Sequence, residues 1–437
     1  MTFFIIVLII LMLIVLIGLL KIHPFIAFLL VSVIAAFLLG IPLNKVATSI
    51  EKGIGDMLGS IVVIITLGAM LGKLVADSGA AQKIAAVMMQ IFGKEYIRLA
   101  LMITGFIIGL PLFYGVGFVL MVPLIFSIVY KYKLPAVYLG LPLLASLSVT
   151  QGFLPPHPAP TALVSQFHAN IGITLLYGII VAVPTVTIAG LFFSRFLKKM
   201  PSEPLKAFVA VEMPESQLPG TVNSFLTALL PVILLMALTL LSLAFQLNPA
   251  VKNVFAFLAA PSIVLLIALV FATISLGVFQ KKSIKQLMDS YEGAIKDIAS
   301  ILLIIGGSGA LKQVLTDSGA SNDIAALLQG FNLQPLLLGW LIAAIIRVSI
   351  GSATVAGLTA AGIIMPLMIS AHSNPNLMVL SIGAGSLMFS HVNDSGFWLF
   401  KEYFNLSIKN TLLSWSIMET LIAFIGLAGV LILNNFV

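Results

Sequence analysis

The chain has 437 residues, of which 60% are apolar and 8% are charged, with a mean hydropathy of +1.19. Soluble domains carry roughly 25% charged residues, so this composition excludes a soluble globular protein. The absence of cysteine excludes disulfides, thiol catalysis and thiolate metal sites.

Apolar stretches of about the 20 residues that a bilayer core requires recur along the chain. They include Phe3–Leu20, Pro24–Ile41, Thr221–Phe245 and Asn253–Phe279. We expect these segments to be helices, because lipid offers no water to hydrogen-bond an open backbone. Phe3–Leu20 lacks a basic start and a small-residue cleavage site, so we interpret it as the first span and not as a signal peptide. The sequence therefore predicts an all-α polytopic membrane protein.

A repeat with a period of 240 residues runs through the sequence. The segment Gly53–Gln90 aligns without a gap on Gly293–Gly330, and 13 of these 38 positions are identical. The densest match is the sequence Asp-Ser-Gly-Ala, at Asp77–Ala80 and again at Asp317–Ala320. A polar signature at constant offset indicates an internal duplication, and repeats of this kind commonly enclose the substrate site of secondary transporters. The Asp-Ser-Gly-Ala segments themselves are expected to be helix caps and turns.

The two halves are predicted to share one layout. Each has two long spans, a third span that ends at Asp-Ser-Gly-Ala (Asp56–Ala76 and Lys296–Thr316), and a short amphipathic stretch. A re-entrant hairpin, a broken transmembrane helix and a final intact span follow. The two hairpin tips and the two breaks are predicted at Leu110–Gly117, Ile350–Ala356, Gln151–Pro160 and Ser390–Gly396.

Charge placement predicts the orientation. If the N-terminus is outside and each half crosses five times, most of the 22 lysine and arginine residues fall inside, as the positive-inside rule requires. An odd number of crossings inverts the second half relative to the first. The predicted domains are a first inverted repeat over residues 1–196, a cytoplasmic linker over 197–220 and a second inverted repeat over 221–437. The net charge of +7 then belongs to loops beside the lipid bilayer and requires no nucleic-acid partner.

The second hairpin tip carries candidate solute ligands. Helix N-termini that meet at membrane depth carry partial positive charge, which suits an anionic solute. Gly351, Ser352 and Thr354 offer a close-approach glycine and two hydroxyls, which suit a carboxylate or a polyol. Packing between helices is the alternative, since small residues are common at such contacts.

Both breaks carry polar side chains. In the second, Asp394 could bind a proton or a cation, while His391 and Asn393 offer hydrogen bonds to hydroxyls. The alternative is a satisfied polar cluster that only stabilises the break. In the first break, His157 lies in a proline-rich segment that interrupts the helix. His157 could bind the solute or a proton, or its imidazole could have a purely structural role.

Two further charges lie within apolar segments. Arg347 could neutralise a solute carboxylate or pair with Asp394, or it could extend its charge to the membrane interface. Glu419 could be a proton relay or a hydrogen-bonded helix contact. No nucleotide-binding motif, nucleophile–base pair or metal-ligand cluster is visible in the sequence, so neither an enzyme nor a bound cofactor is expected.

Four motifs resemble the bacterial gluconate permease family, and the likeness covers essentially the whole chain. They are Leu67–Lys73, Gly152–Pro158, Gly351–Ala356 and His391–Phe400. The resemblance implies a symporter of protons with gluconate or a related sugar acid, multi-pass in the bacterial inner membrane, and the charge placement described above puts both termini outside. It also implies a homodimer in which a transport domain moves against a scaffold, as in an elevator-type transporter.

Two positions depart from the family pattern. Relatives usually carry a glutamate where this chain has Gly115, beside the candidate substrate ligand Tyr114, and close gluconate relatives often have a histidine where Gln151 stands. Coupling would then use Asp394, Glu419 or a histidine, or the chain is a weakly coupled facilitator. A permease for D-serine or another small hydroxy acid, and a channel or membrane scaffold, are the remaining alternatives.

Overall fold

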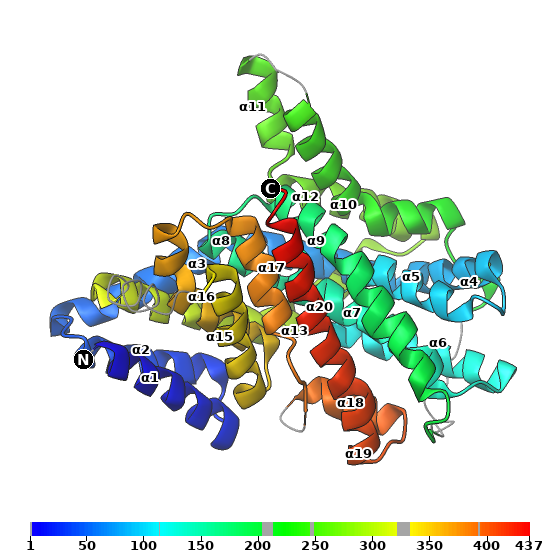
Figure 1. Ribbon diagram of the computed structural model, residues 1–437. Helices are drawn as coiled ribbons and strands as arrows, with labels where there is room; N and C mark the ends of the chain where they lie inside the picture. Colours follow the sequence, from blue (N-terminus) through cyan, green and yellow to red (C-terminus); the bar gives the residue numbers. More distant parts are fainter. Residues whose placement is uncertain (1, 113, 203–212, 245–248, 321–332, 392–393) are drawn as a thin grey trace.

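The computed structural model describes residues 2–112, 114–202, 213–244, 249–320, 333–391 and 394–437, and its regular secondary structure in these ranges is helical throughout (Figure 1). In chain order the α-helices are α1 (Thr2–Leu13), α2 (Pro24–Leu38), α3 (Leu43–Asp77), α4 (Ala80–Phe92), α5 (Ile97–Gly109), α6 (Tyr114–Tyr132), α7 (Ala136–Phe153), α8 (Pro158–Gln166), α9 (Ile171–Val186), α10 (Thr221–Ala244), α11 (Pro249–Leu258), α12 (Pro261–Ala272), α13 (Ile284–Asp317), α15 (Pro335–Ile350), α16 (Ala353–Ser370), α17 (Pro375–Gly385), α18 (Ser395–Tyr403), α19 (Ile408–Thr411) and α20 (Ile417–Leu433). Short π- or 3-10-helical turns extend α1 to Leu19, α9 to Leu197 and α12 to Gln280, and precede α20 from Leu412.

The described residues confirm a polytopic membrane protein. They include seven helical stretches that are long and apolar enough to cross a membrane, or eight if the bent helix α3 is counted as one span. The bend in α3 is 44° and separates Leu43–Gly59 from Val62–Asp77. Helix α11 stands out from the remaining helices (Figure 1), whereas α10 and α12 also pack against α4 and α3, respectively.

One predicted span is wrong. The apolar stretch Asn253–Phe279 is not a single helix, because α11 ends at Leu258 and α12 begins at Pro261. Proline has no backbone N–H and disfavours a helical conformation in the residue before it. Ala260 is accordingly extended, with φ −60° and ψ 125°.

Helices α3 and α13 cross in backbone contact. A Cβ atom at Gly53 would lie 2.3 Å from the carbonyl oxygen of Gly309, and one at Gly309 would lie 2.3 Å from that of Gly53. No residue other than glycine avoids these clashes at either position. Such close crossings of small residues are a common way for membrane helices to associate.

The two Asp-Ser-Gly-Ala segments adopt the same turn, which confirms the prediction of caps. Gly79 and Gly319 take left-handed conformations with φ of 79° and 75°, which favour glycine. In each turn the serine hydroxyl donates to a carbonyl three residues earlier, 3.2 Å for Ser78 and 3.1 Å for Ser318. The same two hydroxyls accept the N–H groups of Ala80 and Ala320, both at 3.3 Å.

Part of the segment 197–220 contacts helix α4 through polar side chains. Gln82 and Met213 exchange two hydrogen bonds of 3.1 Å, and Lys83 lies 3.4 Å from Glu215. Residues 203–212, within this predicted linker, lie outside the described residues.

Helices α7 and α17 form the buried centre, and both predicted breaks follow them. After α7 the chain leaves the helical conformation until Pro158, and after α17 the described residues before Ser395, namely Ser386–His391 and Asp394, lie outside any helix. The two helices meet where a Cβ atom at Gly383 would lie 2.7 Å from the carbonyl oxygen of Gly152. The packing therefore brings two chain breaks, predicted separately from the sequence, to one place in the protein.

Candidate functional site

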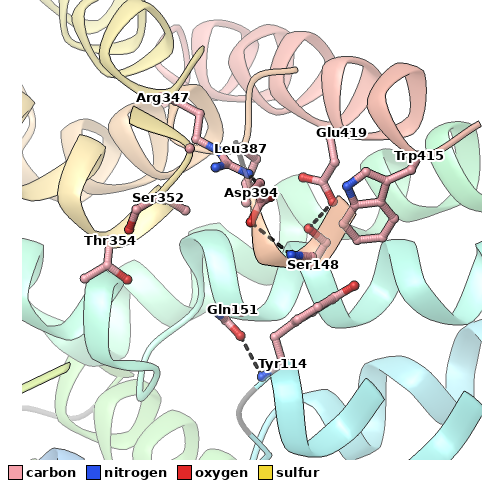
Figure 2. A pocket seen from close by; sticks show the side chains of 13 residues that line it. Tyr114, Ser148, Gln151, Arg347, Ser352, Thr354, Leu387, Asp394, Trp415 and Glu419 are labelled. Carbon is pink, nitrogen blue, oxygen red and sulfur yellow. Dashed lines mark hydrogen bonds and ion pairs between the residues drawn. The ribbon is translucent and has the colours of Figure 1, made fainter. Parts of the chain in front are cut away.

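A cavity of about 200 Å³ lies beside these breaks (Figure 2). It is smaller than the ~300–1,000 Å³ sites of drug-sized ligands and suits a small solute. Its lining comes from helices α6, α7, α15, α16, α18 and α20 and from the segments beside them, and consists of Tyr114, Ser148, Gln151, Arg347, Gly351, Ser352, Ala353, Thr354, Leu387, Asp394, Gly396, Trp415 and Glu419.

Three helices begin at the cavity wall. Tyr114 starts α6, Ser352 caps α16 and Asp394 caps α18. Helix N-termini carry partial positive charge and unpaired N–H groups, so an anion is favoured where they converge. The local caps use some of these donors: Gln151 accepts the N–H of Tyr114 at 2.6 Å, and Ser352 accepts that of Val355 at 3.4 Å.

Two of the lining residues, Arg347 and Asp394, form an ion pair that is largely buried. Arg347 Nη2 lies 2.5 Å from Asp394 Oδ2, with side chains only 4% and 15% exposed. The Ser390 hydroxyl donates to the same carboxylate oxygen, and the N–H of Gly396 donates to Oδ1 at 3.0 Å. Both oxygens of Asp394 are therefore engaged by donors of the protein.

Arg347 keeps unused donors. Its Nε and Nη1 atoms are buried and have no hydrogen-bond partner among the described residues. A guanidinium presents donors in a planar fork that matches a carboxylate. The residue is thus neutralised by one acid on one side and has donors left for a second anion.

The second break is held to the last span by side chains. Trp415 Nε1 donates to the Ser390 hydroxyl at 2.7 Å, and the Ser416 hydroxyl donates to the Ser390 carbonyl. Since Ser390 also binds Asp394, the ion pair is connected to the segment that precedes α20.

Glu419 has a different environment from Asp394. Its side chain is 1% exposed, and its Oε1 accepts the Ser148 hydroxyl at 2.5 Å. Within the described part of the chain, Oε2 has no partner, and neither has the buried hydroxyl of Tyr114. The Tyr114 ring lies beside that of Trp415, with 5.9 Å between ring centroids.

The structure brings together most of the residues predicted for a site. Seven line the cavity: Tyr114, Arg347, Gly351, Ser352, Thr354, Asp394 and Glu419. They are separated by up to about three hundred positions in the chain and meet only because the breaks and the hairpin tips pack together.

Four predicted residues lie elsewhere or are not described. His157 is buried and bonds the Gly109 carbonyl through Nε2 at 2.6 Å, beside a separate, much smaller cavity. His391 bonds the Val348 carbonyl at 2.8 Å and is not among the described lining residues. Gly115 follows Tyr114 but is exposed, with open space where a Cβ would be. Asn393 lies outside the described residues.

Sequence reasoning missed Ser148 and Trp415 and noted Gln151 only as a departure from a family pattern. Ser148 and Gln151 are three residues apart on α7, so they share a helix face. Two polar side chains three residues apart on a largely buried helix are a signal that could have found them. Nothing local in the sequence marks Trp415. Among the described residues, no group of three His, Asp or Glu side chains could hold a metal ion.

Comparisons with known proteins agree with this architecture. A family model described as GntP family permease matches residues 1–437. The Gnt-II system L-idonate transporter of Escherichia coli (strain K12) is 46% identical over 415 residues, which cover 95% of this chain and 94% of that one. The gluconate permease of Bacillus subtilis (strain 168) is 46% identical over 426 residues, 95% of either chain.

A solved structure shows the same fold. The YdaH transporter of Alcanivorax borkumensis superposes with a TM-score of 0.69 and 17% identity, covering 95% of this chain and 98% of that one. The family match confirms the resemblance expected from the four sequence motifs. The chain belongs to the GntP family of permeases and is a multi-pass membrane transporter, not an enzyme.

Proposed function

We propose that this protein is a secondary transporter that imports gluconate or a related sugar acid together with a proton. The observation that carries the solute assignment is Arg347, which lines a cavity where three helix N-termini converge and has two buried donors without a partner in the described part of the chain. Gluconate and L-idonate, the solutes that appear in the names of two relatives, are both carboxylates with a polyhydroxy chain. A polar cavity lined by Ser352 and Thr354 suits such a solute.

The proton is assigned to Glu419. Both oxygens of Asp394 are already engaged by donors of the protein: a cation, a hydroxyl and a backbone N–H. Among the described residues, Glu419 has a single hydroxyl partner and one oxygen without a partner, and a buried carboxylate with so little compensation is costly to ionise. Asp394 then acts as the resident counterion of Arg347, and Gly115 contributes no titratable group.

The transport architecture we infer has two inverted repeats, residues 1–196 and 221–437, joined by a cytoplasmic linker over 197–220. Helices α5 and α6, and α15 and α16, are the two re-entrant hairpins, and both termini lie outside the bacterial inner membrane. The identical turns at Ser78 and Ser318 and the contact between the two breaks support this arrangement. We further infer elevator motion in a homodimer, by analogy with the family resemblance.

Uptake into proteoliposomes tests the function. An inward proton gradient should drive accumulation of labelled gluconate, and a protonophore should abolish it. Arg347→Lys keeps the positive charge but loses the planar set of donors that a guanidinium offers to a carboxylate, so the variant should bind gluconate more weakly. Failure to accumulate gluconate, or preferential uptake of D-serine, would overturn the assignment; uptake without any effect of the gradient would identify a facilitator.

A further inference from the structure

The cavity has two chemically different ends. In Figure 2, Arg347, Ser352 and Thr354 lie on one side, and Tyr114 and Glu419 lie on the other. Arg347 provides unused donors at the first end. At the second end, the groups that have no hydrogen-bond partner among the described residues are the hydroxyl of Tyr114 and the Oε2 atom of Glu419.

Both groups at the second end are buried, and buried polar groups in native proteins nearly always have a hydrogen-bond partner. Leaving such a group unpaired costs about 1–3 kcal/mol. Because Tyr114 and Glu419 line a cavity, a bound solute can supply the missing partners. A hydroxyl group suits both, since it can donate to a carboxyl oxygen and exchange a hydrogen bond with a phenol.

The two groups are also held in place. Ser148 donates to the other oxygen of Glu419 at 2.5 Å, and the backbone N–H of Tyr114 donates to Gln151 at 2.6 Å. The Tyr114 ring lies against Trp415, which is itself anchored by its hydrogen bond to Ser390. Positions fixed in this way can distinguish solutes by the placement of their hydroxyls.

We propose that Tyr114 and Glu419 form a hydroxyl-recognition subsite that binds the end of the sugar acid remote from its carboxylate. The inference rests on the proposed function, since it requires the carboxylate at Arg347. The subsite selects acids whose chain carries hydroxyls far from the carboxyl group, and disfavours short hydroxy acids. It also distinguishes gluconate from L-idonate, which differ in configuration only at C5, near the remote end.

Equilibrium binding of labelled gluconate to purified protein in nanodiscs, at one pH and without a gradient, separates recognition from coupling. Unlabelled gluconate, L-idonate and the three-carbon acid glycerate are the competitors. Tyr114→Phe removes only the hydroxyl and should weaken gluconate binding about three- to tenfold, the effect of one neutral hydrogen bond. Glycerate binding should not change, and the gluconate to L-idonate affinity ratio should shift. Glu419→Gln should also alter that ratio while leaving glycerate unaffected.

Tyr138→Phe is the matched control, because that ring stacks under Arg98, outside the cavity, and the variant should bind all three acids as the parent does. If the parent protein binds no gluconate, the proposed function fails. If the parent binds gluconate but Tyr114→Phe and Glu419→Gln leave gluconate binding unchanged, or weaken gluconate and glycerate equally, the subsite is refuted.

Discussion

Replacing Asp394 with asparagine removes the only anionic partner that the described residues offer Arg347 within salt-bridge distance. The amide keeps an oxygen that can accept the N–H of Gly396, so the cap of α18 can persist. What disappears is the negative charge 2.5 Å from Arg347 Nη2. The variant therefore isolates the counterion role from the capping role.

The expected loss of folding stability in Asp394→Asn follows from the burial of Arg347. Arg347 is 4% exposed, and breaking a buried ion pair by removing one partner costs about 3–5 kcal/mol. A solute carboxylate at Arg347 can replace the lost anion. Gluconate at 100 times its Kd stabilises the folded protein by about 2.7 kcal/mol, so it should restore much of the loss.

The same reasoning predicts an unusual transport phenotype. The empty carrier of Asp394→Asn would have to change orientation with an uncompensated buried cation, whereas the loaded carrier would be neutralised by its solute. Net accumulation of gluconate should be lost while exchange of internal for external gluconate continues. Glu419→Gln should behave differently, retaining uptake down a gluconate gradient but losing its dependence on the proton gradient.

The assays are thermal stability in nanodiscs, with and without gluconate, and paired accumulation and exchange measurements in proteoliposomes. Asp56→Asn is the matched control, because the Lys52–Asp56 pair is 56% and 67% exposed. Exposed pairs contribute about 1 kcal/mol or less, so this control should remain stable and accumulate gluconate. Unchanged stability together with full accumulation in Asp394→Asn would refute the counterion role.

Three further outcomes are expected. Thr354→Val should lower gluconate affinity roughly two- to tenfold, measured by competition binding, because one wall hydroxyl is lost; parental affinity would remove this side chain from the site. Gly115→Glu places a carboxyl in open space beside the cavity and should strengthen proton-coupled uptake at low external pH, near the carboxyl's usual pKa of about 4.3, whereas identical pH profiles would show that this position carries no proton. Gly53→Leu should prevent the close crossing with Gly309 and reduce folded protein in the membrane, whereas Gly55→Ala, with nothing within 4 Å of its Cβ, should express normally.

The sequence alone predicted those features that have a local physical cause. Apolar stretches must be helical in lipid, which placed α2 and α10 within a few residues of their observed bounds. Proline-rich and polar interruptions marked both breaks, because a proline cannot continue the hydrogen-bonding pattern of a helix. Apolar composition alone does not locate every helix end, since the stretch around Pro261 is apolar throughout and yet a new helix begins at this proline.

Only the tertiary structure decided which polar side chains share a cavity. Ser148 and Glu419 are separated by 271 positions yet lie 2.5 Å apart, because α7 and α20 pack together. His157 looked as suitable a ligand as Tyr114 in sequence, but its ring bonds the Gly109 carbonyl beside a different cavity. The spacing of residues along one helix determines which of its faces is polar, whereas the partner of that face depends on how distant helices pack.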